Sequence, residues 1–129
     1  MINARITQMD LQLSRTLVCV DGVLDLANVD EFNAEVRSAL ERQPALLLID
    51  LLGCKFIDSS VIAALFHLHM SLDGAGPKLA VIARRGPRRS LRLAGVDEVM
   101  PVFAAMVDAL QALNGAGRDG TASTRAPGV

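Results

Sequence analysis

The pattern of apolar and polar residues along the chain predicts an alternation of strands and helices. Residues 6–13 alternate as a half-buried strand does, and 17–20 form a second strand that pairs with it as a hairpin around a turn at 14–16. The apolar run 45–49 is continuous and short, which is typical of a strand buried on both faces of a sheet. Residues 79–83 form another run of this kind, so the chain has at least four strands.

The first predicted helix lies between the second and third strands. Asn28 and Glu31 have the three-residue spacing of a capping box, which marks a helix start, and Pro44 ends the helix. Its apolar residues recur with the helical period of 3.6 and define one buried face. This face consists of Val29, Phe32, Val36, Ala39 and Leu40.

Three further helices follow from start and stop signals. One is expected over about 61–73 with Asp58 in its cap, and another begins at Pro87 and ends at Gly95. Residues 99–102 are expected to form a short edge strand before the last helix. The apolar face expected for that helix is Phe103, Met106, Val107, Leu110 and Leu113.

This order of elements predicts one α/β domain, with a mixed sheet of four to five strands and about four helices. Helical crossovers join the later strands, which are therefore expected to be parallel. A chain of 129 residues with 51% apolar composition suits a single domain. The domain is expected to span 1–113, because apolar periodicity is lost over 114–129, which we interpret as a disordered tail.

Composition excludes several classes of function. The chain has four Phe and no Trp or Tyr, which argues against modules that stack nucleic-acid bases on aromatic rings, and its net charge is −1. Its apolar runs are far shorter than the roughly 18 residues that a membrane span needs, and no signal peptide is recognised. Two cysteines, Cys19 and Cys54, are too few for a disulfide scaffold or a zinc site. A cytoplasmic protein without a cofactor is the expectation.

Three segments are expected to converge beyond the carboxyl ends of the parallel strands, where ligands and partners of such sheets gather. They are residues 21–25, 54–60 and 84–89. In the second segment, Asp58 and Ser59 stand at the start of a helix, where either residue can serve as a simple N-cap. A phosphoryl group on Ser59 is also favoured there by the unpaired N–H groups of the helix. Both interpretations stand at this point.

Several motifs resemble those of the STAS domain family, in its phosphorylatable anti-sigma-factor-antagonist type. Phe56-Ile57-Asp58-Ser59-Ser60 resembles the family's phosphorylation motif, in which the serine after the aspartate is the acceptor, here Ser59. Gly22-Val23-Leu24-Asp25 resembles its Gly-x-Leu-Asp sequence, and residues 93–103 resemble its ending. The likeness covers about residues 8–113 in order and spacing. The family usually has Gly where this chain has Val61, which narrows the approach to the first helical turn.

The resemblance implies a STAS-like fold and a protein-binding switch that is not an enzyme. The unphosphorylated protein is expected to bind an anti-sigma factor with a serine-kinase-like ATPase fold, and phosphorylation of Ser59 to release it. A phosphatase resets the switch, which regulates sigma-factor-dependent transcription. Neither direct nucleic-acid binding nor membrane insertion is expected, and a weak homodimer is left open. The partner-binding residues are expected to be Asp25, Asp58, Ser59, Ser60, Val61, Ile62, Arg84 and Arg85.

Two readings compete with a switch of this kind. A STAS module that never switches serves as a scaffold in a stressosome-like or lipid-transport complex. An enzyme is disfavoured, because Ser59 and His67 lie about 12 Å apart along one helix, beyond hydrogen-bond reach. His67 and His69 point away from each other on that helix, so they cannot share a metal ion.

A basic cluster allows two interpretations of its own. Residues 84–92 contain five Arg and no acidic residue, whereas the chain before them has six basic and ten acidic residues. The cluster is either a solvated helix face or a contact for an anion or an acidic partner near Ser59. Positive charge in the first turns of a helix is unfavourable, which gives the second interpretation weight.

Overall fold

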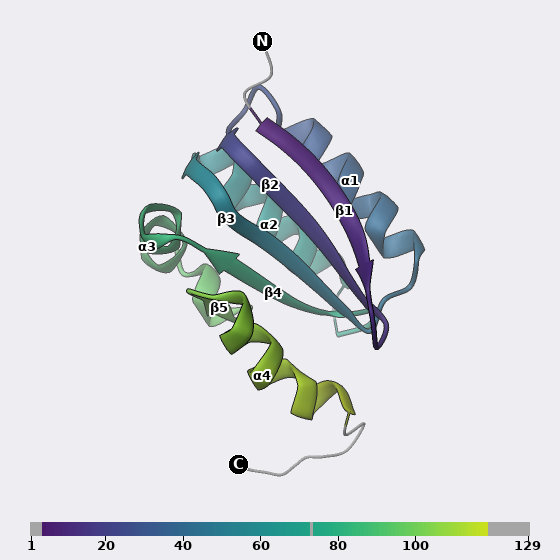
Figure 1. The fold of residues 1–129 in the computed structure, drawn as a ribbon. Coiled ribbons are helices and arrows are strands. Elements are labelled where there is room, and N and C mark those ends of the chain that lie inside the picture. Colours follow the sequence, from purple (N-terminus) through teal and green to yellow (C-terminus); the bar gives the residue numbers. More distant parts are fainter. Residues whose placement is uncertain (1–3, 73, 119–129) are drawn as a thin grey trace.

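The computed structural model describes residues 4–72 and 74–118, which form a layered α/β structure around a five-stranded sheet (Figure 1). The predicted fold class is confirmed. In chain order the elements are β1 (Ala4–Leu11), β2 (Arg15–Leu24), α1 (Val29–Glu41), β3 (Leu46–Ile57), α2 (Ser59–Leu72), β4 (Lys78–Ala83), α3 (Arg85–Leu93), the 3₁₀ helix η1 (Val96–Glu98), β5 (Val102–Phe103) and α4 (Met106–Arg118).

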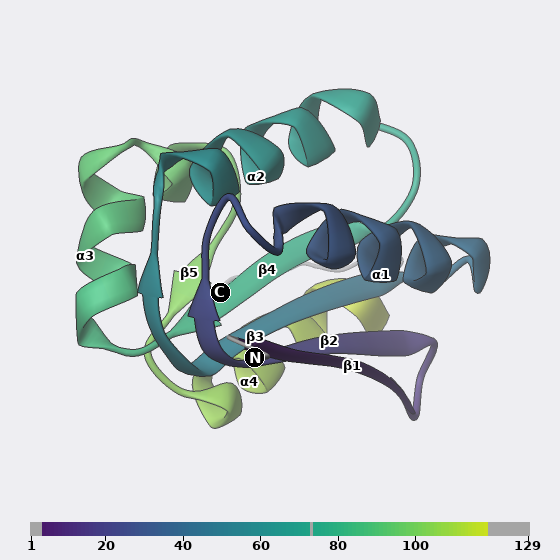
Figure 2. The ribbon, with the colours of Figure 1, turned by 90° about the horizontal axis from the view of Figure 1, so that it is seen from above.

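The strands lie across the sheet in chain order, β1-β2-β3-β4-β5. β1 and β2 form the predicted antiparallel hairpin, with Ala4 opposite Gly22 and Leu11 opposite Arg15. The remaining pairs are parallel, as expected for strands joined by helical crossovers. Helices α1 and α2 cover one face of the sheet, α4 lies on the other face near β4 and β5, and α3 stands beside the end of β3 (Figures 1 and 2).

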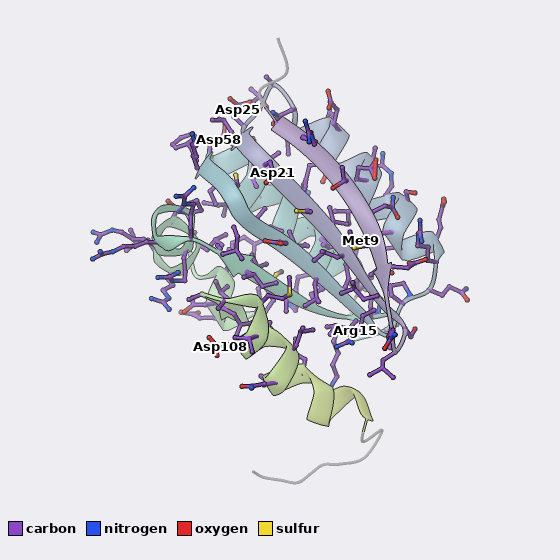
Figure 3. The ribbon with its side chains drawn as sticks, in the orientation of Figure 1. Met9, Arg15, Asp21, Asp25, Asp58 and Asp108 are labelled. Atoms are coloured by element: carbon purple, nitrogen blue, oxygen red, sulfur yellow. The ribbon has the colours of Figure 1, made fainter. Side chains whose placement is uncertain are left out.

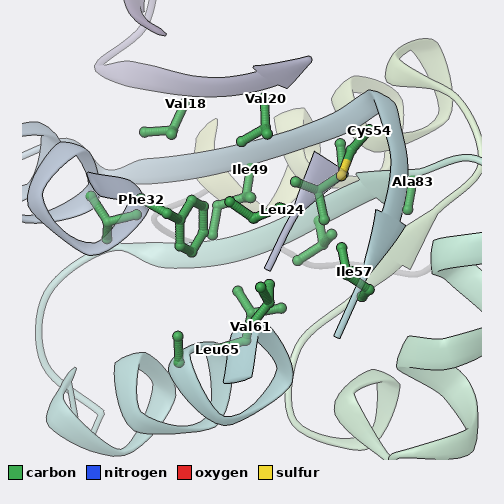
Figure 4. Close-up of a cluster of buried hydrophobic side chains, with 14 of the residues drawn as sticks. Val18, Val20, Leu24, Phe32, Ile49, Cys54, Ile57, Val61, Leu65 and Ala83 are labelled. Atoms are coloured by element: carbon green, nitrogen blue, oxygen red, sulfur yellow. The ribbon is translucent and has the colours of Figure 1, made fainter. Parts of the chain in front are cut away.

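The central strand β3 explains why its apolar run is continuous. Leu47 and Ile49 point into the large core beneath α1 and α2, whereas Leu46 and Leu48 point into a smaller core beneath α4. Both faces of β3 are therefore buried, which confirms the prediction that the run 45–49 belongs to a strand covered on both sides. The large core is mainly aliphatic, with Phe32 buried in it from α1 (Figure 4) and Phe66 of α2 packed against its margin.

β2 and β3 are longer than their apolar patterns predict. They stay paired past two register shifts and end together, with Leu24 opposite Ile57. Polar residues and glycines interrupt the apolar pattern of this stretch, so the pattern alone ends both strands too early. Gly53 is needed here because a Cβ at its position would lie 1.8 Å from Oδ1 of Asp21 on the neighbouring strand. The extension carries both strands to the edge where α1 and α2 begin.

The hairpin turn lies earlier than predicted. The sequence places it at 14–16, but β2 already begins at Arg15, and Thr16 is buried and paired with Asp10 of β1. The turn instead uses Leu13 and Ser14, which have positive φ angles of 65° and 57°. Leucine rarely adopts this left-handed conformation, so the residue types around the turn gave no signal for its position.

The last third of the fold differs from prediction in three details. α3 begins at Arg85, so Pro87 is the third helical residue and not the first. The short edge strand is shifted from 99–102 to Val102–Phe103, because residues 99–101 form the exit from η1, which ends at Glu98. Phe103 therefore belongs to β5 and not to the last helix, although it contacts the same small core. The predicted helix end at Gly95 is confirmed, since this glycine has a φ of 85°.

The predicted domain boundary at 113 falls inside α4. This helix continues to Arg118, so the first part of the predicted tail, residues 114–118, is helical. The physical reason is that a helix can run past its last packed apolar side chain while its backbone hydrogen bonds continue. Residues 119–129, the rest of the predicted tail, and residues 1–3 lie outside the described part of the chain.

Candidate functional site

The carboxyl ends of β2, β3 and β4 meet at one edge of the sheet, where α1, α2 and α3 begin (Figure 2). Of the three segments predicted to converge, 21–25 and 54–60 contain the ends of β2 and β3, and 84–89 follows the end of β4. We call this region, residues 21–28, 54–60 and 84–89, the loop edge. Partners and ligands of parallel sheets bind at such edges, because the helix N-termini and the loops face solvent there.

Asp58 joins β3 to α2 and caps the helix with its side chain, as predicted. Its Oδ1 accepts hydrogen bonds from the Ser60 N–H at 3.0 Å, the Val61 N–H at 3.3 Å and the Ser60 hydroxyl. The Ser60 hydroxyl has the largest effect on the pKa of Asp58, which is lowered from its ordinary value of 3.8. Burial, the next largest effect, raises this pKa, and the backbone N–H groups that donate to the carboxylate lower it further. The carboxylate is therefore ionised at neutral pH.

The second oxygen of Asp58 reaches across to the loop between β2 and α1. Oδ2 accepts a hydrogen bond from the Leu26 N–H at 3.0 Å. Figure 3 shows Asp25 and Asp58 close together at this end of the sheet. One carboxylate thus holds the first turn of α2 and the neighbouring loop at the same time. Asp58 therefore links the segment 54–60 to the loop that follows β2 at the loop edge.

The predicted capping box of Asn28 and Glu31 is wrong. Asn28 occupies the N-cap position of α1 but makes no side-chain cap hydrogen bond. It is buried and turns back into its own loop, where its Oδ1 accepts the Asp25 N–H at 2.8 Å and its Nδ2 donates to the Val23 carbonyl at 2.9 Å. These loop groups are close to Asn28 because β2 extends to the loop edge, and they satisfy the amide in place of the helix.

Asp25 also supports this loop. Its Oδ1 accepts the Ala27 N–H at 3.0 Å, and its backbone carbonyl accepts the Asn28 N–H at 3.1 Å. The side chain is half-buried at the loop edge. The loop from Asp25 to Asn28 is therefore a hydrogen-bonded turn with a defined shape.

Ser59 and Ser60 are adjacent but differ in environment. Ser59 is the first residue of α2, and its side chain is exposed. Within the described residues its hydroxyl makes no hydrogen bond to protein, whereas the Ser60 hydroxyl donates to Asp58 and is half-buried. A reagent at the loop edge can therefore reach the Ser59 hydroxyl directly, whereas the Ser60 hydroxyl would first have to leave its hydrogen bond to Asp58.

The prediction that Val61 contacts a partner needs correction. Its side chain is fully buried in the large core, next to Leu65 and Phe32 (Figure 4). A residue at the third position of this helix points toward the sheet, so Val61 neither narrows the approach to Ser59 nor offers a contact surface. Ile62 is half-buried and contacts the core from its margin.

Arg84 and Arg85 bring positive charge to the loop edge. Arg84 is the N-cap residue of α3, both side chains are exposed, and neither pairs with an acidic residue among those described. Burial, the largest effect, raises the pKa of the Cys54 thiol in β3, and the charge of Arg84 partly opposes this rise. Arg88 donates to the Ala83 carbonyl at 2.9 Å and so ties α3 to the end of β4.

Two residues of the loop edge were missed by sequence reasoning. Leu26 and Phe56 are large apolar side chains, yet both are exposed. A weak signal existed for Leu26, an apolar residue inside the polar turn between Asp25 and Asn28. Phe56 could not be recognised, because the sequence does not tell which face of the extended β3 is covered.

Other candidate chemistries are not assembled in the described part of the chain. The Cys19 thiol donates to Asp50 at 3.8 Å, and burial, followed by the charge of Asp50, raises the pKa of Cys19 to about 11. This thiol is therefore protonated and unreactive at neutral pH. The described residues contain no group of three or more His, Cys, Asp or Glu side chains that could hold a metal ion. Nor do they include a helix long and apolar enough to cross a membrane.

Solved structures share this fold. An anti-sigma factor antagonist from Mycobacterium paratuberculosis is similar at a TM-score of 0.79 and 24% identity, over 86% of this chain and 94% of that chain. The phosphorylated form of the Bacillus cell fate determinant SpoIIAA is similar at a TM-score of 0.59 and 18% identity, over 84% and 99%. The murine anion transporter Slc26a9 is similar at a TM-score of 0.66 and 21% identity, over 78% of this chain but 18% of the transporter.

The sequence comparisons identify the family. No curated protein sequence matches the chain closely enough to count as a relative. The family described as "Mlab, STAS domain" matches residues 7–110, which is most of the chain and includes part of β1, the strands β2 to β5, the helices α1 to α3 and the loop edge. The resemblance noted in the sequence motifs is confirmed by this match and by the shared fold. The chain therefore belongs to the STAS domain family.

Proposed function

We propose that this protein is an anti-sigma-factor antagonist that works as a switch. In its unphosphorylated form it binds an anti-sigma factor with a serine-kinase-like ATPase fold, in the cytoplasm, and thereby regulates sigma-factor-dependent transcription. Phosphorylation of Ser59 releases the partner, and a phosphatase resets the switch. The protein acts by binding, needs no cofactor and is not an enzyme.

The observation that carries this proposal is the environment of Ser59. Its hydroxyl is exposed at the first position of α2, while Asp58 occupies the neighbouring Ser60 hydroxyl. A kinase therefore finds Ser59 available and Ser60 engaged. The likeness to the anti-sigma factor antagonist and to phosphorylated SpoIIAA supports the same role.

A phosphoryl group on Ser59 is expected to leave the fold intact. The positive end of α2 favours it, whereas the adjacent Asp58 carboxylate opposes it, and each effect is worth on the order of 1 kcal/mol. Asp58 already accepts the N–H groups of Ser60 and Val61, so the phosphate is left facing solvent. The added charge, about −1.5 to −2 at neutral pH, thus remains at the surface where a partner docks.

The docking surface that we propose includes most of the residues predicted from the sequence. Ser59 stands at its centre beside Asp25 and Asp58, and Arg84 and Arg85 form a basic margin. Ser60 and Ile62 shape the first turn of α2 beneath it. Val61 is left out because it is buried. A partner that covers Ser59 has to desolvate any phosphate there, and an uncompensated buried charge costs about 3 to 5 kcal/mol.

The test uses purified anti-sigma factors of the kinase-like type encoded in the source organism's genome. Titration calorimetry is expected to give tight binding for the wild type and for Ser59→Ala, and a loss of about 100- to 5000-fold for the Ser59-phosphorylated protein. Incubation with ATP and magnesium, followed by phosphopeptide mapping, is expected to label Ser59. Dominant label on Ser60, or full labelling of Ser59→Ala, would contradict the assignment.

A second function is supported by the likeness to part of the anion transporter Slc26a9, which shows the same fold inside a larger protein. In this alternative the chain is a non-switching STAS scaffold in a stressosome-like or lipid-transport complex. The titration separates the two functions. Binding that is equal for the bare and the phosphorylated protein supports the scaffold and rejects the switch.

A further inference from the structure

The loop edge exposes two large apolar side chains close to Ser59. Leu26 is 74% exposed and Phe56 is 54% exposed. Phe56 is the next-to-last residue of β3, opposite Val23 of β2, and Leu26 follows the end of β2. Ser59 comes three residues after Phe56, and the N–H of Leu26 is bonded to Asp58, so the backbones of both residues lie near the serine.

Single exposed apolar residues are common on protein surfaces and need no function by themselves. Leu26 differs in how its backbone is held. Its N–H donates to Asp58, and the turn that carries it is closed by the bonds of Asp25 and Asn28. The turn therefore holds the backbone of an exposed apolar residue in a defined conformation. A pre-organised backbone loses less conformational entropy when a partner binds it.

Phe56 is fixed in a different way. The neighbouring Ile57 is buried in the large core, and side chains alternate between the two faces of a strand, so Phe56 points away from that core. Pairing with Val23 in the sheet holds its backbone. Aromatic side chains on rigid backbone are frequent hot spots of protein interfaces.

We infer that Leu26 and Phe56 are the apolar anchors through which the partner protein docks beside Ser59. This inference rests on the proposed function and gives a binding role to Leu26, which lies outside the quoted motifs, and to Phe56, the first residue of the motif around Ser59. The two side chains supply the apolar contact, and the polar groups around them, Asp25, Asp58 and Ser59, form a rim. Protein interfaces have this anatomy, with apolar anchors surrounded by polar groups.

The charges at the loop edge indicate what kind of partner fits. Charges of both signs lie at the loop edge, with Asp25 and Asp58 bonded into the turn of Leu26 and Arg84 and Arg85 at the start of α3. A uniformly anionic membrane or nucleic acid would meet the two carboxylates, whereas a protein surface can present acidic groups to the arginines alone. The partner is therefore a folded protein with an apolar socket for Leu26 and Phe56 and acidic side chains opposite the two arginines. The shape of the partner's socket decides binding, because the backbones of Leu26 and Phe56 are held in place before the partner arrives.

The experiment compares two pairs of substitutions in the full-length protein. The test pair is Leu26→Ser and Phe56→Ser. The control pair is Leu13→Ser and Met70→Ser, which removes side chains of similar exposure, 74% and 69%, at the other end of the sheet and of α2. Melting curves are expected to be nearly the same for all four variants, because none of these side chains packs in a core.

Affinity is measured by calorimetry with the kinase-like anti-sigma factor that binds the wild type in the preceding test. Each substitution of the test pair is expected to weaken binding about tenfold or more, and the control pair less than about twofold. Equal affinity of both pairs would overturn the inference and leave the switch intact, provided that phosphorylation of Ser59 still abolishes binding. Absence of wild-type binding to every candidate would overturn the proposed function and this inference together.

Discussion

α2 and α3 both begin at the loop edge, but their first turns differ in charge and in hydrogen bonding. Asp58 caps α2, and an acid at this end is favoured by the helix dipole. Arg84 stands in the same position before α3 and makes no side-chain cap bond, and Arg85 and Arg88 follow it in the first turn. One helix start is built for stability, whereas the other carries charge that the helix dipole disfavours.

α3 is held by other means. Pro87 and Leu91 are buried, Leu91 fully so, and Arg88 is bonded to the end of β4. Tertiary packing therefore keeps a helix in place whose own first turn is unfavourable. Residues that oppose local stability are expected where they serve a partner, which agrees with the basic margin of the proposed docking surface.

The largest expected effect tests whether packing holds α3. Leu91→Ala removes a fully buried side chain and is expected to lower the free energy of unfolding by about 2 to 5 kcal/mol. Leu93→Ala, two residues later on the exposed side of the same helix, is the matched control and is expected to change it by less than about 0.5 kcal/mol. Urea denaturation measures both, and similar values would show that packing does not hold this helix.

The next effect tests the cap of α2. Asp58→Ala removes the acceptor of the Ser60, Val61 and Leu26 N–H groups and is expected to cost about 1 to 2 kcal/mol of unfolding free energy. Asp58→Asn retains one oxygen for the cap and is expected to cost less. The difference between the two variants in urea denaturation measures the cap, and equal losses would point to the charge of Asp58 instead.

A smaller effect of opposite sign is expected at the start of α3. Arg85→Glu replaces a charge that the dipole disfavours by one that it favours, which is expected to raise the unfolding free energy by about 0.3 to 1 kcal/mol. The same variant is expected to weaken partner binding. Arg92→Gln, in the last turn where positive charge is favoured, is the control and is expected to be slightly destabilising. An Arg85→Glu protein with a lower unfolding free energy than the wild type would refute the claim that the dipole of α3 disfavours the charge of Arg85.

The smallest effect is a dependence on pH. The pKa of Asp58 in the folded protein lies below its ordinary value of 3.8, first because of the Ser60 hydroxyl. The ionised carboxylate therefore stabilises the fold above about pH 3.8, and this contribution is lost as the pH falls through the lower folded pKa. The difference in unfolding free energy between wild type and Asp58→Asn is expected to shrink below pH 4. A constant difference would contradict the role of this charge.

Much of the candidate site could be predicted because its signals are local. Asp58 follows a strand and precedes a helix, so its capping role can be read from the order of residues. The motif around Ser59 and the family likeness are equally local in sequence. Asn28 had the same kind of signal, and the prediction failed because the extended β2 offered its amide closer partners.

The sequence by itself determined the order of elements, the buried strands, the cap at Asp58 and the helix end at Gly95, since apolar period and residue type act over a few neighbouring residues. Only the tertiary structure decided how far β2 and β3 run, that Val61 faces the core, and that Leu26 and Phe56 face solvent. These features depend on which face of an element another element covers. Such contacts join residues far apart in the chain, and no pattern within one segment records them.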